Sequence, residues 1–194
     1  KVIAPDAAVS DSFGTSVSQS GDLLAIGAHQ TDTAGKSNTG SVYLYHVEAN
    51  GTATFLQKVM ATDGAVDDRF GYSVSQSGNL LAVGAYYADP DGKSNAGAAY
   101  LYRVEANGTV THLKKVIAPD GANDDLFGRS VSQSANLLAV GARGSDPDGI
   151  SGAGAAYLYR LEANGSVSFL QKVIAPDGAD DDCFGYSVSQ AGEK

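Results

Sequence analysis

Hydrophobic residues along the chain either alternate with polar residues or form short continuous runs, and turn-forming residues interrupt them about every eight to twelve positions. Alternation indicates a strand with one buried face, whereas a short continuous apolar run indicates a strand buried on both faces. The sequence has no helical stripe with apolar residues every three to four positions. The pattern therefore predicts short antiparallel strands, which in one copy cover residues 70–76, 80–85, 98–104 and 110–116.

Two kinds of tight turn join the predicted strands. Glu-Ala-Asn-Gly stands between the third and fourth strands of each copy, and Asn-Gly favours a two-residue hairpin turn in which both residues have positive φ. A second hairpin turns at Gly21 and Gly78, and Ala135 replaces this glycine in the third copy. Hairpins at both positions predict that each unit is a four-stranded antiparallel sheet.

The whole pattern repeats with a fixed period of 57 residues, because Lys-Val-Ile-Ala-Pro-Asp at Lys1 returns in similar form at Lys58, Lys115 and Lys172. A period of this length is typical of units that bury their apolar faces by stacking on their neighbours. The units are three full repeats at 1–57, 58–114 and 115–171 and a partial repeat at 172–194. We expect them to form one partial domain.

Four-stranded antiparallel units in tandem predict an all-β fold, in which the chain is a segment of a β-propeller and each unit is one blade. The second strand, residues 80–85 in the middle copy, should be the core strand because it is apolar almost throughout. A β-solenoid is the alternative architecture. Its coils are usually shorter than this period and lack hairpin turns.

Three short motifs recur in a fixed order: Phe-Gly-x-Ser-Val, then Gly-Ala about a dozen residues later, then Gly-x-x-Tyr-Leu-Tyr. This order resembles the FG-GAP repeat of integrin α-subunit heads and of many bacterial extracellular proteins. The resemblance implies a propeller of seven blades when complete, calcium in some blades, and binding in place of catalysis. The matching pairs are Phe13-Gly14 with Gly27-Ala28, Phe70-Gly71 with Gly84-Ala85, Phe127-Gly128 with Gly141-Ala142, and a final Phe184-Gly185.

The calcium loop of the family does not transfer to this chain. In integrins this loop connects the first and second strands of a blade, but here the connection is only Ser20-Gly21-Asp22 or its equivalent. One carboxylate in a tight turn cannot supply the six to eight oxygen ligands that calcium takes.

Acidic residues are concentrated instead in the loop after the second strand and in the loop between blades. Because successive strands run in opposite directions, both loop types should emerge on one face of the propeller. These carboxylates either accept backbone N–H bonds and cap the loops, or form a cation site shared with Asp67, Asp124 or Asp181. The inter-blade aspartates are Asp6, Asp63, Asp120 and Asp177, each followed five residues later by Asp11, Asp68, Asp125 or Asp182.

The loop after the second strand offers a second candidate calcium site. Asp89 and Asp91 flank a proline in one copy, and Asp146 and Asp148 do so in the next. Pro-Asp-Gly is turn chemistry first, but two carboxylates this close could also hold a weak, partly hydrated calcium ion. Ala34 replaces the second aspartate in the first copy, so that copy should bind least.

Composition narrows the classes of function. With 22 acidic and 13 basic residues, the formal net charge is −9, which argues against a nucleic-acid partner and favours basic or cation-bridged ligands. No apolar run approaches the ~20 residues of a membrane span. The single Cys183 has no intrachain partner. The three histidines occupy three different repeat positions and match no catalytic or metal-binding spacing, so we expect no enzymatic activity.

These features predict a non-enzymatic extracellular module for binding or cell adhesion, with a protein or glycan ligand at the acidic loop face. The alternatives are a carbohydrate-binding propeller that uses Tyr86 and Tyr87, and an accessory domain of a secreted hydrolase. A seven-bladed ring at this period needs roughly 400 residues. We therefore expect a longer chain or self-association to complete the ring, and we expect apolar strands 23–28 and 137–142 to be exposed in the end blades.

Overall fold

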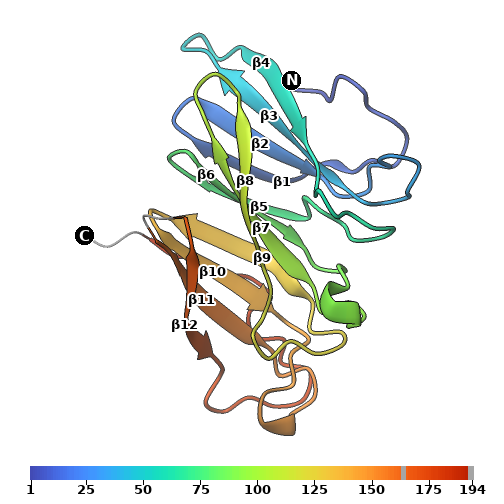
Figure 1. Ribbon diagram of the computed structural model, residues 1–194, viewed down its shortest axis with the longest axis vertical. Helices are drawn as coiled ribbons and strands as arrows, with labels where there is room; N and C mark the ends of the chain where they lie inside the picture. The colour runs from blue at the N-terminus through green and yellow to red at the C-terminus, as the bar shows by residue number, and fades with distance from the viewer. Residues whose placement is uncertain (163–164, 192–194) are drawn as a thin grey trace.

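The protein is built from three four-stranded antiparallel sheets that follow one another along the long axis of the molecule (Figure 1). The computed structural model describes residues 1–162 and 165–191. Strands occupy each sheet in chain order, as expected of propeller blades, so the predicted all-β propeller segment is confirmed. Over this described part of the chain the only helical turns are two short 3-10 turns, and no helix is long and apolar enough to cross a bilayer.

Each blade begins at or just after its Phe-Gly pair and ends shortly after the start of the next sequence repeat. The first blade comprises β1 (Phe13–Ser20), β2 (Leu23–Ala28), β3 (Ser41–Val47) and β4 (Ala53–Val59). The second comprises β5 (Ser73–Ser77), β6 (Leu80–Ala85), η1 (Pro90–Gly92), β7 (Ala98–Val104) and β8 (Val110–Val116). The third comprises β9 (Phe127–Ser134), β10 (Leu137–Ala142), η2 (Pro147–Gly149), β11 (Ala155–Leu161) and β12 (Val167–Val173).

The strand predictions for the second blade hold at both ends of β6, β7 and β8. The first strand of that blade begins at Ser73, three residues later than predicted. Phe70 instead forms a single parallel bridge with Gly40 of the preceding blade. Phe70, just before the first strand of this blade, therefore takes part in the junction between blades.

The hairpin between β3 and β4 is present, but its predicted turn type is wrong. Gly51 has φ +82°, whereas Asn50 is not among the residues with positive φ. The Gly51 N–H donates to the Glu48 carbonyl at 2.8 Å, and the Glu48 N–H donates to the Thr52 carbonyl at 2.8 Å. These bonds define a three-residue loop in which a turn is followed by a left-handed glycine, so only the glycine needs positive φ.

The hydrophobic core lies between the blades. Phe70 is fully buried and packs with Val42 and Leu44 of the first blade as well as with Tyr100 of its own blade. Its ring meets the Tyr100 ring edge to face at 5.4 Å, and the equivalent rings of the third blade, Phe127 and Tyr157, meet at 5.5 Å. Phe70 and Phe127 thus pack the second and third blades against the blade that precedes each.

Small residues allow the first two strands of one blade to approach the first strand of the next blade closely; we call the first strands, β1, β5 and β9, the inner strands. A Cβ atom at Gly84 would lie well inside van der Waals contact of the Gly128 carbonyl oxygen. Serine hydroxyls of one inner strand bond to the main chain of the next: Ser73 donates to the Gly128 carbonyl at 2.8 Å, and Ser75 accepts from the Gln133 N–H at 2.8 Å. The first blade makes the same bonds from Ser16, Ser18 and Ser20.

The expected exposure of strands 23–28 and 137–142 in the end blades is wrong, because both are buried apart from their first residue. In the first blade, Leu24 and Ile26 pack with Ala4, and the Tyr45 hydroxyl donates to the Ile3 carbonyl at 2.9 Å. The segment before β1 therefore folds over this sheet. Val17 of β1 is exposed instead. Its exposed fraction is 59%, whereas those of Val74 and Val131 at the same repeat position are 9% and 8%.

Candidate functional site

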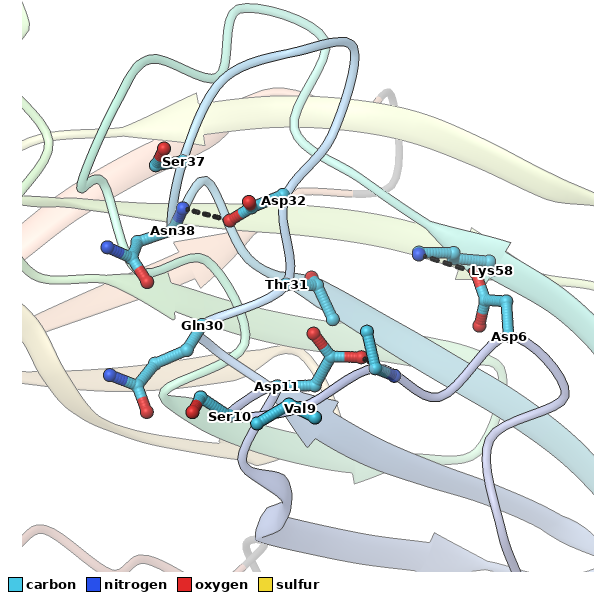
Figure 2. Close-up of a pocket in the computed structure, with 11 residues that line it drawn as sticks. Asp6, Val9, Ser10, Asp11, Gln30, Thr31, Asp32, Ser37, Asn38 and Lys58 are labelled. Carbon is cyan, nitrogen blue, oxygen red and sulfur yellow. Dashed lines mark hydrogen bonds and ion pairs between the residues drawn. The ribbon is translucent and has the colours of Figure 1, made fainter.

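The loop before β1 and the loop between β2 and β3 together line a pocket of about 410 Å³ on one face of the first blade. Figure 2 shows three carboxylates around it: Asp6 and Asp11 come from the first loop and Asp32 from the second. Lys58, which lies on β4, also lines this pocket. The expectation that these two loop types share a face is confirmed.

The same pocket recurs in the second blade with a volume of about 500 Å³. Its acidic lining is larger, because Asp63 and Asp68 are joined there by both Asp89 and Asp91, with Lys115 in the place of Lys58. We call these two cavities the acidic pockets. In the third blade the equivalent loops carry Asp120, Asp125, Asp146 and Asp148.

In the three loops that a described blade follows, the first aspartate is hydrogen-bonded to a tyrosine and a lysine of that blade. The Tyr100 hydroxyl donates to Asp63 at 2.9 Å, and the Lys115 ammonium donates to the other carboxylate oxygen at 2.6 Å. The sets Asp6, Tyr43, Lys58 and Asp120, Tyr157, Lys172 repeat these contacts. The loop is thereby anchored to the outer half of the sheet.

These contacts govern the charge of the anchored carboxylates. Burial alone would raise the pKa of the Asp63 carboxyl, but the hydrogen bonds from Lys115 and Tyr100 outweigh burial and hold the pKa below its ordinary value. Burial, followed by the Asp63 charge, raises the pKa of the Tyr100 hydroxyl. Asp63 is therefore an anion at neutral pH, and its bonds to Tyr100 and Lys115 stabilise the fold until acid protonates it.

The second aspartate of each inter-blade loop caps the loop. Asp68 accepts the Ala65 N–H at 2.8 Å and Asp125 accepts the Ala122 N–H at 2.8 Å. Burial is the main reason that the pKa of each of these two carboxyls is raised. This is the loop-capping geometry that the sequence offered as one of two roles. Asp11 and Asp182 make the same contact with Ala8 and Ala179.

In each candidate calcium loop, one aspartate is hydrogen-bonded within the loop and the other is exposed. Asp89 and Asp146 accept the N–H groups of Asn95 and Gly152, each at 2.7 Å, and so close their loops. Asp91 and Asp148 are exposed, with φ +56° and +55°. Over the described ranges, no group of three or more His, Cys, Asp or Glu side chains is arranged to hold a metal ion. A preformed calcium cage is thus not built from these side chains.

The third set of aspartates also has defined partners. Asp67 accepts the Asn38 side-chain amide at 2.8 Å, and Asp124 accepts that of Asn95 at 2.7 Å. Each bond joins an inter-blade loop to the loop after the second strand of the preceding blade. Asp181 lies beside Gly152 of the third blade, in the equivalent place.

Sequence reasoning missed the link between aspartate, tyrosine and lysine. Its signal is the constant separation of 37 residues between each aspartate and its tyrosine, and of 52 residues to its lysine. In an exact repeat every pair of positions has a constant separation, so spacing alone could not single out these three. Only the folded geometry identifies them as a unit.

Comparisons with known proteins agree with this architecture. The family model described as FG-GAP repeat matches residues 1–45, 54–102 and 110–159. The periplasmic gluconolactonase PpgL of Pseudomonas aeruginosa is similar with a TM-score of 0.50 and 15% identity, over 82% of this chain and 39% of that one. Sqt1 of Chaetomium thermophilum is similar with a TM-score of 0.54 and 17% identity, over 88% of this chain and 38% of that one.

At these identities the two structures support the fold alone. The chain spans about two fifths of the length of each. No curated protein sequence matches the chain.

Proposed function

Because the chain belongs to the FG-GAP repeat family, we propose that it is part of a non-enzymatic extracellular binding or adhesion module whose acidic pockets receive basic groups of a protein or glycan ligand. The recurrence of the acidic pocket from blade to blade carries this proposal. Repeated sites at a fixed spacing let one ligand engage several pockets, which raises its overall affinity without any new type of contact.

The charge of the pockets favours a basic ligand. Lys58 and Lys115 neutralise only the anchored aspartates Asp6 and Asp63. In the second pocket Asp89 and Asp91 have no ion-pair partner among the described residues. A surface of one sign concentrates ligands of the opposite sign, and salt screens this attraction.

We therefore expect the lysine peptide Ac-(Gly-Lys)₃-NH₂ to bind this face and to lose about tenfold in affinity between about 50 mM and about 500 mM salt. The double change Asp89→Asn and Asp91→Asn should weaken binding, while Asp22→Asn, in a turn at the other end of the first blade, should not. NMR titration measures both. Binding that is insensitive to salt, or that maps to the β3–β4 and β7–β8 turns, would contradict the proposal.

Weak calcium binding at Asp89 with Asp91, and at Asp146 with Asp148, is a second part of the proposal. The exposed second carboxylate of each pair supports it, and water molecules would have to complete the six to eight oxygen ligands. The aspartates Asp63, Asp68, Asp120 and Asp125 are less suited to metal binding because hydrogen bonds within the protein already engage them.

Millimolar calcium should raise the melting temperature slightly, by about 2 °C, because a ligand selective for the folded state stabilises it. Asp148→Ala should reduce this rise, whereas Asp22→Ala should leave it unchanged. Differential scanning calorimetry with calcium and with a chelator measures the effect. Identical melting curves in both conditions would show that these loops act as turns only.

A carbohydrate-binding propeller is the second candidate function. It is favoured by the contacts of Tyr86 with two other tyrosines, since the centre of its ring lies 4.4 Å from that of Tyr72 and 4.1 Å from that of Tyr87. A glycan array separates this function from protein binding. The third candidate function is that of an accessory domain in a secreted hydrolase. The full reading frame tests it by showing whether a catalytic region accompanies these repeats.

We also propose that further blades complete the ring, from more of the same polypeptide or from a second copy. The exposed Val17 supports this, because Val74 and Val131 at the same position are covered by the preceding blade. Leu158 of the third blade is only partly buried, whereas Leu44 and Leu101 are fully buried against the following blade. Native mass spectrometry distinguishes the two sources of blades.

A further inference from the structure

Tyrosine and arginine side chains from neighbouring blades form a continuous row at the start of the inner strands. Tyr72 precedes β5, Tyr86 follows β6, Arg129 lies near the start of β9, Arg143 follows β10, and Tyr186 follows the last Phe-Gly pair. We call these five residues the arginine ladder. Antiparallel pairing of Ser73 with Gly84 puts Tyr72 and Tyr86 at the same end of their sheet, which is the end that carries the acidic pockets.

Arg129 is the centre of the ladder. Its guanidinium carbon lies 4.2 Å from the centre of the Tyr186 ring and 5.0 Å from that of Tyr72, and the guanidinium donates a hydrogen bond to the Tyr72 hydroxyl. Arg143 lies 6.0 Å from the Tyr186 ring. Stacking on aromatic rings fixes the planar guanidinium in place and leaves its edge for hydrogen bonds.

The two arginines of the ladder lack an anionic partner. In the described part of the chain, the ion pairs of arginine and lysine involve Lys58, Arg69, Lys115 and Lys172 only. The Nε atoms of Arg129 and Arg143 are buried without a hydrogen-bond partner. The chain as a whole has a net charge of −9, so these two guanidinium groups, which lie on tyrosine rings and pair with no carboxylate, form a local positive site.

Comparison of the copies within the chain shows that the fold does not require these side chains. The position after Phe-Gly is Thr15, Tyr72, Arg129 or Tyr186, and the position after Gly-Ala is His29, Tyr86 or Arg143. The flanking Phe-Gly and Ser-Val-Ser-Gln residues are the same in every copy. Blade packing therefore fixes the flanking residues and leaves the ladder positions free to serve another purpose.

We propose that the arginine ladder is a docking site for a carboxylate side chain, Asp or Glu, in an exposed loop of a protein partner. The edge of a guanidinium matches a carboxylate in geometry and charge. Tyrosine and arginine are also the side chains enriched where a few residues carry most of the energy of a protein interface. The partner then places an acidic group at the inner strands and basic groups at the acidic pockets further out.

This inference rests on the proposed role in binding but uses different residues, so separate variants test the two. The probe is the peptide Ac-(Gly-Glu)₃-NH₂, with its glutamine analogue as the uncharged control. We expect NMR titration to detect binding of the glutamate peptide only, with shifts at Tyr72, Arg129 and Tyr186. Arg129→Gln should weaken binding roughly tenfold, because it removes the charge-assisted bonds to the carboxylate.

The matched control is Arg103→Gln, which removes the same charge near the opposite end of the sheet, where Arg103 pairs with Leu80. It should leave binding of the glutamate peptide unchanged. Arg143→Gln and Tyr186→Ala are second variants for the case in which Arg129→Gln does not fold, since Tyr186 is 56% exposed. Each should weaken binding without a change in the melting temperature.

Three results would overturn the inference. The first is equal affinity for the glutamate and glutamine peptides, and the second is an equal loss of glutamate-peptide affinity in Arg129→Gln and Arg103→Gln. The third is tighter binding of oligogalacturonate than of the glutamate peptide at the same arginines, which would assign the site to an acidic glycan. Loss of lysine-peptide binding in the Asp89→Asn and Asp91→Asn variant, with glutamate-peptide binding intact, would support two separate sites. Failure of the lysine peptide alone would count against the acidic pockets and not against the ladder.

Discussion

Gly84→Ala should lower the free energy of unfolding by roughly 3 kcal/mol, because the added methyl group would have to displace main-chain atoms. A Cβ atom at this position meets the carbonyl oxygen of Gly128 in the next blade and the Ser73 hydroxyl. The β5 and β9 backbones cannot separate without losing the Ser73 to Gly128 hydrogen bond. Urea unfolding followed by circular dichroism measures the loss.

Gly178→Ala is the matched control for this change. A Cβ atom there comes no closer than 3.5 Å to any heavy atom, the Ala175 carbonyl oxygen, and its φ is not in the left-handed region. Such a substitution usually alters stability by less than about 1 kcal/mol. Equal stability losses in Gly84→Ala and Gly178→Ala would show that the blades do not approach as closely as described.

Phe127→Ala should destabilise the protein by about 3–5 kcal/mol, the usual cost of removing a buried aromatic side chain. The Phe127 ring is fully buried and packs with Ala99 and Leu101 of the second blade, as well as edge to face with Tyr157. The change therefore removes core within the third blade and between blades together. Thermal unfolding reports the size of the loss.

Phe13→Ala is the natural comparison, because Phe13 holds the same motif position in the first blade. Its ring contacts Tyr43 at 5.5 Å but is only partly buried, since no described blade precedes it. We expect this change to cost roughly 1–2 kcal/mol. A cost as large as that of Phe127→Ala would argue that packing between blades contributes little to stability.

The sequence was a reliable guide where structure depends on local patterns. Continuous apolar runs located β6 and β10, and turn residues located the tight links at Gly21 and Gly78 between the first and second strands. The turn after Glu48 was predicted in place but not in type, because Asn-Gly also fits a three-residue loop in which only Gly51 has positive φ. Local chemistry alone does not choose between these turns.

Features that depend on adjacency between repeats were beyond the sequence. The bond from Tyr100 to Asp63 crosses 37 residues, and the contact of Arg129 with Tyr72 crosses 57. The arginine ladder could not be predicted from a recurring motif, because its residues differ from copy to copy. Burial of Leu24 and Ile26 was missed because it depends on how the segment before β1 folds back over the sheet.

The serine hydroxyls at each blade junction bond only to main-chain atoms of the neighbour, such as the Gly128 carbonyl and the Gln133 N–H. Every residue except proline presents both of these groups, so these hydrogen bonds do not depend on which side chains the adjoining unit carries, and the packing residues of the junction, such as Phe70 and Phe127, recur with each copy. Duplication or deletion of one complete 57-residue unit in the gene would then recreate an equivalent junction without compensating mutations. Arrays of this kind can change length in single genetic steps, while positions such as Tyr72 and Arg129 diversify independently.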